Sequence, residues 1–327
     1  MAPGDLPRQE PSAASAPAFE RFPDRVSIYE VSPRDGLQNE AVMVPREGKR
    51  RLVEALVSAG LRRIEITSFV SPKWVPQLSD AEELARELHA AHSPLQEGVT
   101  FSALCPNAKG LERALAVGLP EIAVFLSSSE THNRKNVNKS VADTLAVFSE
   151  IVPPARKAGI RVRAYVSTVW GCPYEGDVDP RASLNIARKL IELGCYQISL
   201  SDTIGIGNPK QTRDIVKLAL AEMPAEQIAL HMHDTRGTAL ANILVALDLG
   251  VRNFDSSVGG VGGCPYAPGA AGNVATEDLV FMFHGMGVGT GVDLDKLIEA
   301  GNVAEQVIGH PLPGKVHRAG PFKRRGV

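Results

Sequence analysis

The chain has 327 residues, a formal net charge of -2 and an apolar fraction of 44%. This length suits one large domain or two, and the near-neutral charge offers no broad positive field for nucleic acid. No apolar run is long enough to span a bilayer, so we expect neither nucleic acid nor membrane as a partner. Four cysteines occur singly without a Cys-X-X-Cys pair, which argues against a disulfide framework or a structural zinc site.

The two ends of the chain differ in composition from the region between them. Residues 1–24 are rich in Pro, Ala and Ser and lack hydrophobic periodicity, so we predict a disordered leader. This leader has no apolar signal segment and contains acidic residues, which makes the cytoplasm the expected location. Residues 311–327 include five Lys or Arg and are predicted to be a basic flexible tail. We expect residues 25–310 to form one domain.

Eight short runs rich in β-branched residues alternate with amphipathic segments along this domain. The runs cover residues 26–31, 63–67, 100–104, 122–126, 161–166, 197–200, 229–232 and 253–258. The helical patterns that follow them cover residues 46–59, 80–90, 109–117, 141–158, 181–193, 210–223, 239–249 and 277–285. Glycines that suit a left-handed helix end follow five of these patterns, at Gly60, Gly118, Gly159, Gly194 and Gly250. Eight strand–helix units predict a closed (β/α)8 TIM barrel with an additional C-terminal helical segment, rather than an open doubly wound sheet.

Such a barrel gathers the C-terminal ends of its strands at one mouth, where active sites form. Charged side chains pointing inward cost free energy unless they are paired or bind a metal. Several strand ends of this chain carry unusual polar residues, and this concentration favours an active site. A polar network inside the barrel is the alternative for one or two of them. The residues are Arg34, Asp35, Glu65, Thr67, Ser201, Asp202, Thr203, His231 and His233.

The most informative pattern is the pair His231 and His233. Alternation along a strand points both imidazoles to one side, while Leu230 and Met232 point to the other. Together with the Asp35 carboxylate and the Asn273 amide, they suit a divalent cation held partly by hard oxygen ligands. For the His231 and His233 pair alone, the alternative interpretation is two buried histidines whose ring nitrogens are hydrogen-bonded within the protein.

Two glycine-rich loops carry a cysteine over the expected mouth, at residues 170–176 and 262–266. Glycines let a loop approach a ligand closely or adopt positive φ. Cys264 is therefore a candidate catalytic thiol, and its loop leads on to Asn273. For Cys172, a role as a small buried apolar residue is an equally good interpretation.

These motifs resemble those of the hydroxymethylglutaryl-CoA lyases, a family of barrel metallolyases. The resemblance covers residues 26–300 and rests on SPRDGLQNE, IEITSFVSPKWVPQ, GCPYEG, SDTIG, HMHDT, GGCPYAPGAAGN and ATEDLV. It implies cleavage of 3-hydroxy-3-methylglutaryl-CoA into acetyl-CoA and acetoacetate, a retro-Claisen reaction of an acyl-CoA substrate. It also implies a divalent metal cofactor, Mg²⁺ or Mn²⁺, and a homodimer.

Carried over motif by motif, the resemblance implies metal ligands at Asp35, His231, His233 and Asn273 and catalytic roles at Arg34, Asp35, Glu65, Asp202, His233 and Cys264. We expect Arg34 to stabilise the thioester enolate and Cys264 to protonate its carbon. A metal-linked base, His233 or Asp35 with help from Asp202, is expected to take the hydroxyl proton. Glu65 is expected to organise Arg34 or the ligand shell. Substrate contacts are expected from Arg34, Gln38, Lys135, Asn136, Asn138 and Thr203.

Some positions depart from the family pattern. Residues 131–133 are more polar than usual, Arg236 replaces a common tyrosine and Val261 a common leucine. A lyase for a longer branched 3-hydroxyglutaryl-CoA is therefore the first alternative. A synthase that condenses acetyl-CoA with a keto acid and a non-catalytic binding scaffold are more distant ones, and Cys264 argues against the synthase. The segment 130–139 supplies three cations that suit CoA phosphates, or it is a solvated loop.

Overall fold

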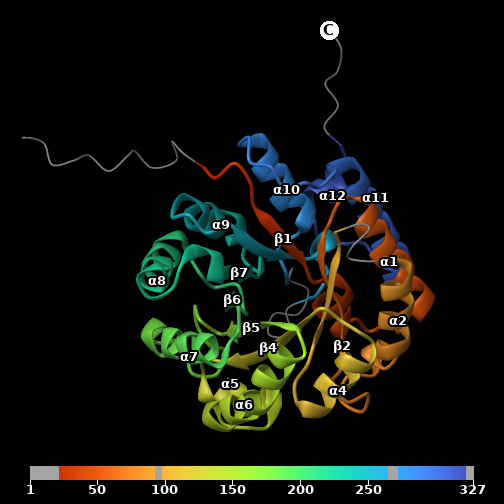
Figure 1. Ribbon diagram of the computed structural model, residues 1–327. Helices are drawn as coiled ribbons and strands as arrows, with labels where there is room; N and C mark the ends of the chain where they lie inside the picture. The colour runs from red at the N-terminus through yellow and green to blue at the C-terminus, as the bar shows by residue number, and fades with distance from the viewer. Residues whose placement is uncertain (1–21, 93–97, 264–271, 322–327) are drawn as a thin grey trace, which may run out of the picture.

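The computed structural model describes residues 22–92, 98–263 and 272–321. Eight parallel strands close into a barrel in chain order, and helices surround it (Figure 1), as the sequence predicted. The strands are β1 Ser27–Glu30, β2 Arg63–Ser68, β3 Thr100–Leu104, β4 Glu121–Ser127, β5 Arg161–Ser167, β6 Gln197–Asp202, β7 Ile228–Met232 and β8 Asn253–Ser256. The C-terminal ends of these strands therefore meet at one mouth.

The outer ring contains every helix that the periodicity predicted, with ends shifted by at most one residue. The helices are α1 Arg46–Ser58, α2 Ala81–Ala91, α4 Ala108–Ala116, α5 Glu130–Val137, α6 Val141–Lys157, α7 Pro180–Leu193, α8 Pro209–Glu222, α9 Ala239–Asp248, α10 Thr276–Gly285, α11 Leu294–Ile308 and α12 Lys315–Ala319. All five glycines predicted to end helices have positive φ, from 73° at Gly118 to 111° at Gly194. No helix in the described ranges is long and apolar enough to cross a membrane.

The segment 130–139, for which the sequence left a solvated loop as one interpretation, contains helix α5, Glu130–Val137. Ser129 caps its first turn by accepting the N–H of His132, and Asn138 ends it in the left-handed conformation with φ of 55°. Lys135 and Asn136 are exposed on this helix. The polar composition of α5 leaves no continuous apolar stripe, which is why hydrophobic periodicity did not reveal it.

The end of the chain is packed onto the barrel's helices. Leu312 is fully buried, the N–H of Gly314 donates to the Gly259 carbonyl at 2.8 Å, and Lys315 Nζ lies 2.8 Å from Asp234 Oδ2. Helix α12 lies beside α10 (Figure 1) and buries His317. The predicted flexible tail is therefore wrong for residues 311–321, because these few contacts anchor an otherwise polar segment. Residues 322–327, like residues 1–21 of the expected leader, lie outside the described residues.

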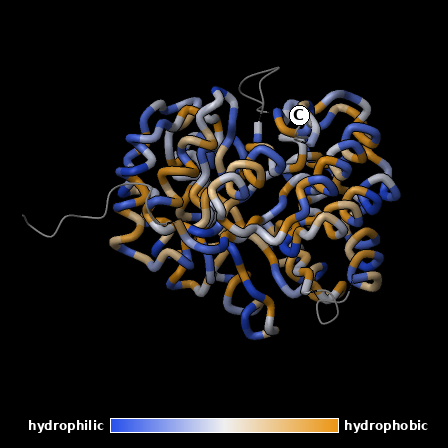
Figure 2. Tube along the Cα trace, turned by 90° about the horizontal axis from the view of Figure 1, so that it is seen from above, coloured by the Kyte–Doolittle hydropathy of each residue, from blue (hydrophilic) through white to orange (hydrophobic). Residues whose placement is uncertain are grey.

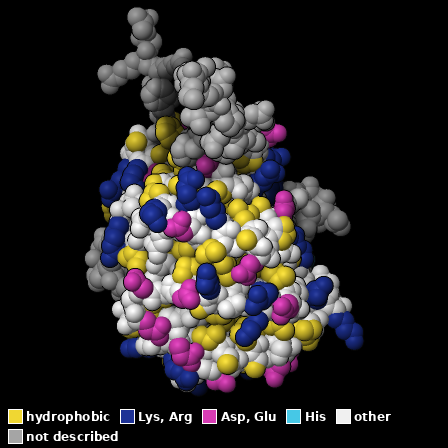
Figure 3. All heavy atoms as spheres, turned by 90° about the vertical axis from the view of Figure 1, so that its left-hand side faces the viewer, with side chains coloured by type: hydrophobic (Ala, Val, Ile, Leu, Met, Phe, Trp, Pro, Cys, Tyr) yellow, Lys and Arg dark blue, Asp and Glu magenta, His cyan; other side chains and the backbone are white. Residues whose placement is uncertain are grey.

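The molecule has an apolar layer between barrel and helices and a polar centre inside the barrel. Ile64 and Ile66 belong to the apolar layer, whereas Glu65 between them hydrogen-bonds inside the barrel to Tyr165. Figure 2 shows the alternation of apolar and polar residues along the chain, which matches this division. On the face shown in Figure 3, Lys and Arg side chains are interspersed with Asp and Glu.

Candidate metal centre

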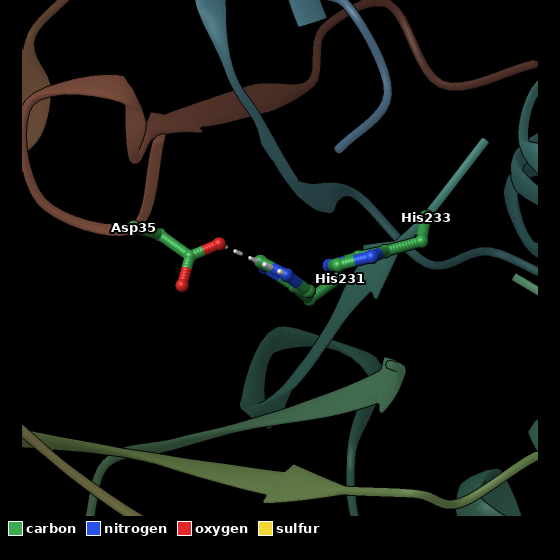
Figure 4. A group of neighbouring side chains, drawn as sticks. All are labelled: Asp35, His231 and His233. Carbon is green, nitrogen blue, oxygen red and sulfur yellow. Dashed lines mark ion pairs between the residues drawn. The ribbon is translucent and has the colours of Figure 1, made fainter. Parts of the chain in front are cut away.

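Asp35, His231 and His233 lie together at the mouth of the barrel (Figure 4). One ligand atom from each lies within 4.8 Å of the others. His231 belongs to β7 and His233 follows it, and their ring centres are 5.3 Å apart. His231 Nε2 lies 3.8 Å from Asp35 Oδ2. The predicted grouping of two imidazoles with one carboxylate is therefore confirmed.

Asp35 is held by a tight π-helical turn, Ser32–Gly36, directly after β1. The N–H groups of Arg34, Asp35 and Gly36 all donate to the Val31 carbonyl, at 3.1, 2.8 and 3.2 Å. Gly36 is closely packed, since a Cβ there would lie 3.1 Å from both Ser257 Oγ and a Val261 methyl. The turn thus presses against the segment after β8 and fixes the carboxylate at the mouth.

Asn273 reaches the same place from the far side of the glycine-rich loop. It forms an isolated antiparallel bridge with His233. Its Nδ2 donates to Asp35 Oδ2 at 2.9 Å and to the Val261 carbonyl at 3.2 Å. The side chain is therefore adjacent to the cluster, and its role as a ligand stays a prediction.

The protonation states in the cluster suit a cation. Burial opposes ionisation of Asp35, but Arg34, the two histidines and the hydrogen bond from Asn273 together outweigh it and hold the pKa of Asp35 well below its usual range. Burial and the neighbouring His231 lower the pKa of His233 to about 4, so its imidazole is neutral at pH 7. His233 Nδ1 is buried and has no hydrogen-bond partner among the described residues. An ionised carboxylate, as at Asp35, and a neutral imidazole, as at His233, are the forms that bind divalent cations, so the cluster fits a metal.

Arg34 lies beside the cluster and is held by two carboxylates. Its Nε donates to Glu65 Oε2 at 2.5 Å and its Nη1 to Asp35 Oδ1 at 2.6 Å. Tyr165 Oη also donates to Glu65 Oε2, at 3.1 Å. Burial raises the pKa of Glu65, and the charge of Arg34 acts against this shift. Glu65 thus contacts Arg34 directly, and no hydrogen bond joins it to His231 or His233 within the described chain.

Asp202 braces the loop that follows β6. Its Oδ1 accepts the N–H of Ile206 at 3.1 Å and its Oδ2 accepts the N–H of Gly207 at 2.8 Å. Burial raises the pKa of Asp202, and these backbone donors counter the shift. Its main-chain oxygen accepts the N–H of His233 at 3.3 Å. The neighbouring Thr203 Oγ1 accepts the N–H of Thr168 at 2.9 Å. Both residues have structural contacts, and their expected parts in catalysis and binding stay predictions.

Four of the six residues expected to contact the acyl-CoA substrate lie at the surface or in an open cleft. Lys135, Asn136 and Asn138 are exposed on α5 and its end, and Lys135 Nζ is 4.4 Å from the ring centre of Tyr174. Gln38 lines an open cleft of about 320 Å³ together with Trp74. In the part of the chain that is described, none of these four expected contact residues hydrogen-bonds to a residue of the metal cluster.

Of the two loop cysteines, the structure describes Cys172 but not Cys264. Cys172 is buried, and its thiol lies 3.0 Å from Ser129 Oγ inside a hairpin closed by Gly176. This environment favours the interpretation of Cys172 as a packed residue. Cys264 lies outside the described residues, so its expected catalytic role stays a prediction. Cys105, Cys172 and Cys195 are free thiols.

Two of the departures from the family pattern have local contacts. Arg236 Nη1 donates to the carbonyls of Ile204 and Gly205, at 2.8 and 3.2 Å. It thus ties the loop after β7 to the loop after β6. Val261 packs against the Asp35 turn and accepts Asn273 Nδ2 through its carbonyl. Both residues support the loops of the mouth.

The sequence reasoning missed a buried ion pair beneath the cluster, between Arg163 of β5 and Asp255 of β8. Burial opposes ionisation of Asp255, but Arg163 and His231 together outweigh it and lower the pKa of Asp255. A signal was present, because Arg163 and Asp255 interrupt strand runs whose neighbours Val162, Ala164 and Phe254 are apolar. Single charges in such runs point into the barrel.

Comparison with known proteins gives consistent matches over nearly the whole chain. A family model described as HMGL-like matches residues 25–304. The hydroxymethylglutaryl-CoA lyase YngG of Bacillus subtilis is 50% identical over 294 residues, which cover 90% of this chain and 97% of YngG. The mitochondrial hydroxymethylglutaryl-CoA lyase of Bos taurus is 48% identical over 307 residues, covering 94% and 93% of the two chains.

A solved structure gives the same result. It is an HMG-CoA lyase from Acinetobacter baumannii in complex with coenzyme A and 3-methylmalate, and its sequence is 39% identical. It superposes with a TM-score of 0.86 over 93% of this chain and 98% of that chain.

Proposed function

Because this chain belongs to the HMGL-like family, we propose that it cleaves 3-hydroxy-3-methylglutaryl-CoA into acetyl-CoA and acetoacetate. The observation that carries the proposal is the grouping of Asp35, His231 and His233 within 4.8 Å, with Arg34 in contact with Asp35. In this reaction the bond between C2 and C3 breaks, the C3 hydroxyl loses its proton and C2 gains one. No oxidant or reductant is needed.

The cleavage makes two demands on the site. The C3 oxygen must give up a proton and become the ketone of acetoacetate, and the electron pair of the broken bond must be stabilised as a thioester enolate. Asp35, His231, His233 and Asn273 would hold a divalent cation, which when bound would supply Lewis-acid stabilisation of negative charge on substrate oxygens. The other demands fall on the side chains of the protein.

Arg34 is the group best placed to stabilise the enolate oxygen. Its Nε and Nη1 are occupied by Glu65 and Asp35, and within the described ranges Nη2 makes no hydrogen bond. Two anchored nitrogens fix the orientation of the guanidinium before substrate binds. A preorganised cation stabilises developing charge without reorganising in the transition state.

His233 is the favoured proton acceptor among the candidates. Its imidazole is neutral at pH 7 and its Nδ1 is unpartnered in the described chain, whereas both Asp202 carboxylate oxygens already accept backbone N–H groups. Asp202 contributes by holding the main chain of His233. Protonation of the enolate carbon by Cys264 is carried over from the family resemblance and completes the proton balance.

The remaining features of the function are proposed from donor chemistry and from the family resemblance. The oxygen donors permit Mg²⁺ or Mn²⁺ and the two imidazoles also accept cobalt or zinc, and the family resemblance favours Mg²⁺ or Mn²⁺. Coenzyme A in the A. baumannii structure supports an acyl-CoA ligand here, with Lys135, Asn136 and Asn138 as contacts. A homodimer follows from the family resemblance. A cytoplasmic location is supported by a Rattus norvegicus relative that carries "cytoplasmic" in its name, whereas the Bos taurus relative carries "mitochondrial".

The direct test is to incubate the purified protein and Mn²⁺ with 3-hydroxy-3-methylglutaryl-CoA and to quantify both products. We expect acetoacetate and acetyl-CoA in equal amounts, and no products from a His231→Ala/His233→Ala variant. A second reaction contains acetyl-CoA and keto acids. Thioester consumption only in that reaction identifies a synthase, and thioester binding without turnover identifies a scaffold; either result contradicts the proposal.

A further inference from the structure

The two ring nitrogens of His231 face different carboxylates. Nε2 lies 3.8 Å from Asp35 Oδ2 in the metal cluster, whereas Nδ1 lies 3.4 Å from Asp255 Oδ2. Pairing between β7 and β8 places His231 directly opposite Asp255. Nδ1 is buried and makes no hydrogen bond within the described chain, so the carboxylate of Asp255 is an ion-pair contact beside it rather than a hydrogen-bond acceptor in this geometry. The imidazole is therefore positioned between an expected metal ligand and a carboxylate from inside the barrel.

Asp255 itself is held firmly on both oxygens. Arg163 donates to Oδ1, and Ser199 Oγ donates to Oδ2 at 2.7 Å. Arg163 is in turn held by Gln197 Oε1, which accepts its Nε at 2.9 Å, and by the ring of Tyr29, whose centre is 4.1 Å from the guanidinium carbon. Asp255 is 1% exposed and Arg163 fully buried. A rigid, charged carboxylate thus faces Nδ1.

A neutral imidazole carries one N–H, which is placed on the nitrogen with the better acceptor beside it. A carboxylate beside Nδ1 favours the N–H there and leaves the lone pair on Nε2, the nitrogen nearer Asp35. Carboxylates that bond the outer nitrogen of a metal-binding histidine fix its tautomer and raise its affinity. The observed order of groups, from Arg163 through Asp255 to His231, matches this arrangement.

We propose that Asp255 is a positioning residue that fixes the tautomer and orientation of His231 and so sets the cation affinity of the centre. Arg163 and Ser199 keep Asp255 in place. This inference rests on the metal centre of the proposed function. It does not depend on which thioester is cleaved.

A purely structural role for Asp255 makes different predictions. If the carboxylate only neutralises Arg163, replacing it lowers the stability of the fold but leaves the tautomer of His231 and the cation affinity of folded protein unchanged. Tyr29→Phe provides the matched control, because it removes a 2.5 Å hydrogen bond to Ser102 from the same buried polar layer without touching His231.

The first experiment measures Mn²⁺ binding to metal-free Asp255→Asn, using electron paramagnetic resonance of free Mn²⁺ and a circular dichroism check that the protein is folded. We expect the dissociation constant to rise by about 10- to 100-fold, and that of Tyr29→Phe to stay within about twofold of wild type. An unchanged constant in folded Asp255→Asn overturns the proposal. Cation binding is measured without substrate, so an absence of lyase activity does not affect this result.

The second measurement reads the tautomer directly, from ¹⁵N chemical shifts of labelled histidine in the metal-free protein. We expect wild-type His231 to carry its proton on Nδ1, and Asp255→Asn to shift the population towards Nε2. A wild-type proton on Nε2 overturns the proposal. Asp255→Asn leaves Arg163 unpaired, so an Arg163→Met/Asp255→Asn variant, which removes both charges, is the substitute if the single variant does not fold. The same loss of Mn²⁺ affinity is expected from it.

Discussion

Replacing Arg34 with lysine tests whether one guanidinium group binds Glu65 and Asp35 and also stabilises the enolate oxygen. Arg34 Nε and Nη1 each hold a carboxylate, at 2.5 and 2.6 Å, and its side chain is only 8% exposed. Lysine has a single ammonium group at the end of a flexible stem. It keeps the positive charge near Glu65 and Asp35 but cannot hold both and also meet the enolate oxygen.

The expected cost follows from this loss of one preorganised donor. Removing such a donor from a developing oxyanion typically costs about 3 kcal/mol, which corresponds to roughly a 100-fold lower kcat. The cation affinity should change by less than about threefold, because the lysine charge still favours the ionised form of Asp35. The substitution should therefore lower kcat while leaving the Mn²⁺ affinity nearly unchanged.

The assay is acetoacetate production at saturating substrate and Mn²⁺, with bound Mn²⁺ measured in parallel. Arg51→Lys is the matched control, because Arg51 is exposed on α1 and donates a hydrogen bond to Gln306 of α11 at 3.3 Å; its kcat should equal that of wild type. A kcat for Arg34→Lys within threefold of wild type refutes the reasoning. So does a loss of activity that is explained entirely by lost Mn²⁺.

Three further changes test other parts of the structure. His233→Ala should abolish stoichiometric Mn²⁺ binding measured by calorimetry, whereas His284→Ala, at an exposed position of α10, should bind normally; a fully loaded His233→Ala protein contradicts the ligand assignment. Burial raises the pKa of Glu277 from 4.5 to about 8, so the folded protein holds a proton that the unfolded chain releases. Its stability should therefore fall as pH rises from 6 to 8, by about 2 kcal/mol; in urea unfolding at both pH values Glu277→Gln should show less of this fall, and an identical fall rejects the assignment. Leu312→Ala should lower the free energy of unfolding by about 2 to 4 kcal/mol because Leu312 is fully buried, and an unchanged urea midpoint contradicts the packing of residues 311–321.

Features with a strong local cause were predictable from the sequence. The β-branched runs form the strands, and glycines such as Gly60 and Gly194 end helices with positive φ, because these positions disfavour a side chain. The grouping of His231 and His233 follows from strand alternation alone. Asp35 was placed by the general rule that strand ends of a barrel meet at one mouth.

Features that depend on tertiary contacts were not predictable in this way. Helix α5 has no apolar stripe, and residues 311–321 are anchored by single contacts such as Leu312 and the Lys315–Asp234 ion pair. Asp255 was missed because its importance comes from its position opposite His231 in β7. That register becomes visible only when the barrel is closed.

The most direct test of the metal centre is a crystal structure of the protein with Mn²⁺, measured at a wavelength where manganese scatters anomalously. We predict one strong anomalous peak at the mouth of the barrel, bonded to Asp35, His231, His233 and the Asn273 amide oxygen at about 2.0 to 2.3 Å. A peak elsewhere, or a fully occupied Mn²⁺ that does not bond to both histidines and Asp35, contradicts the proposed centre.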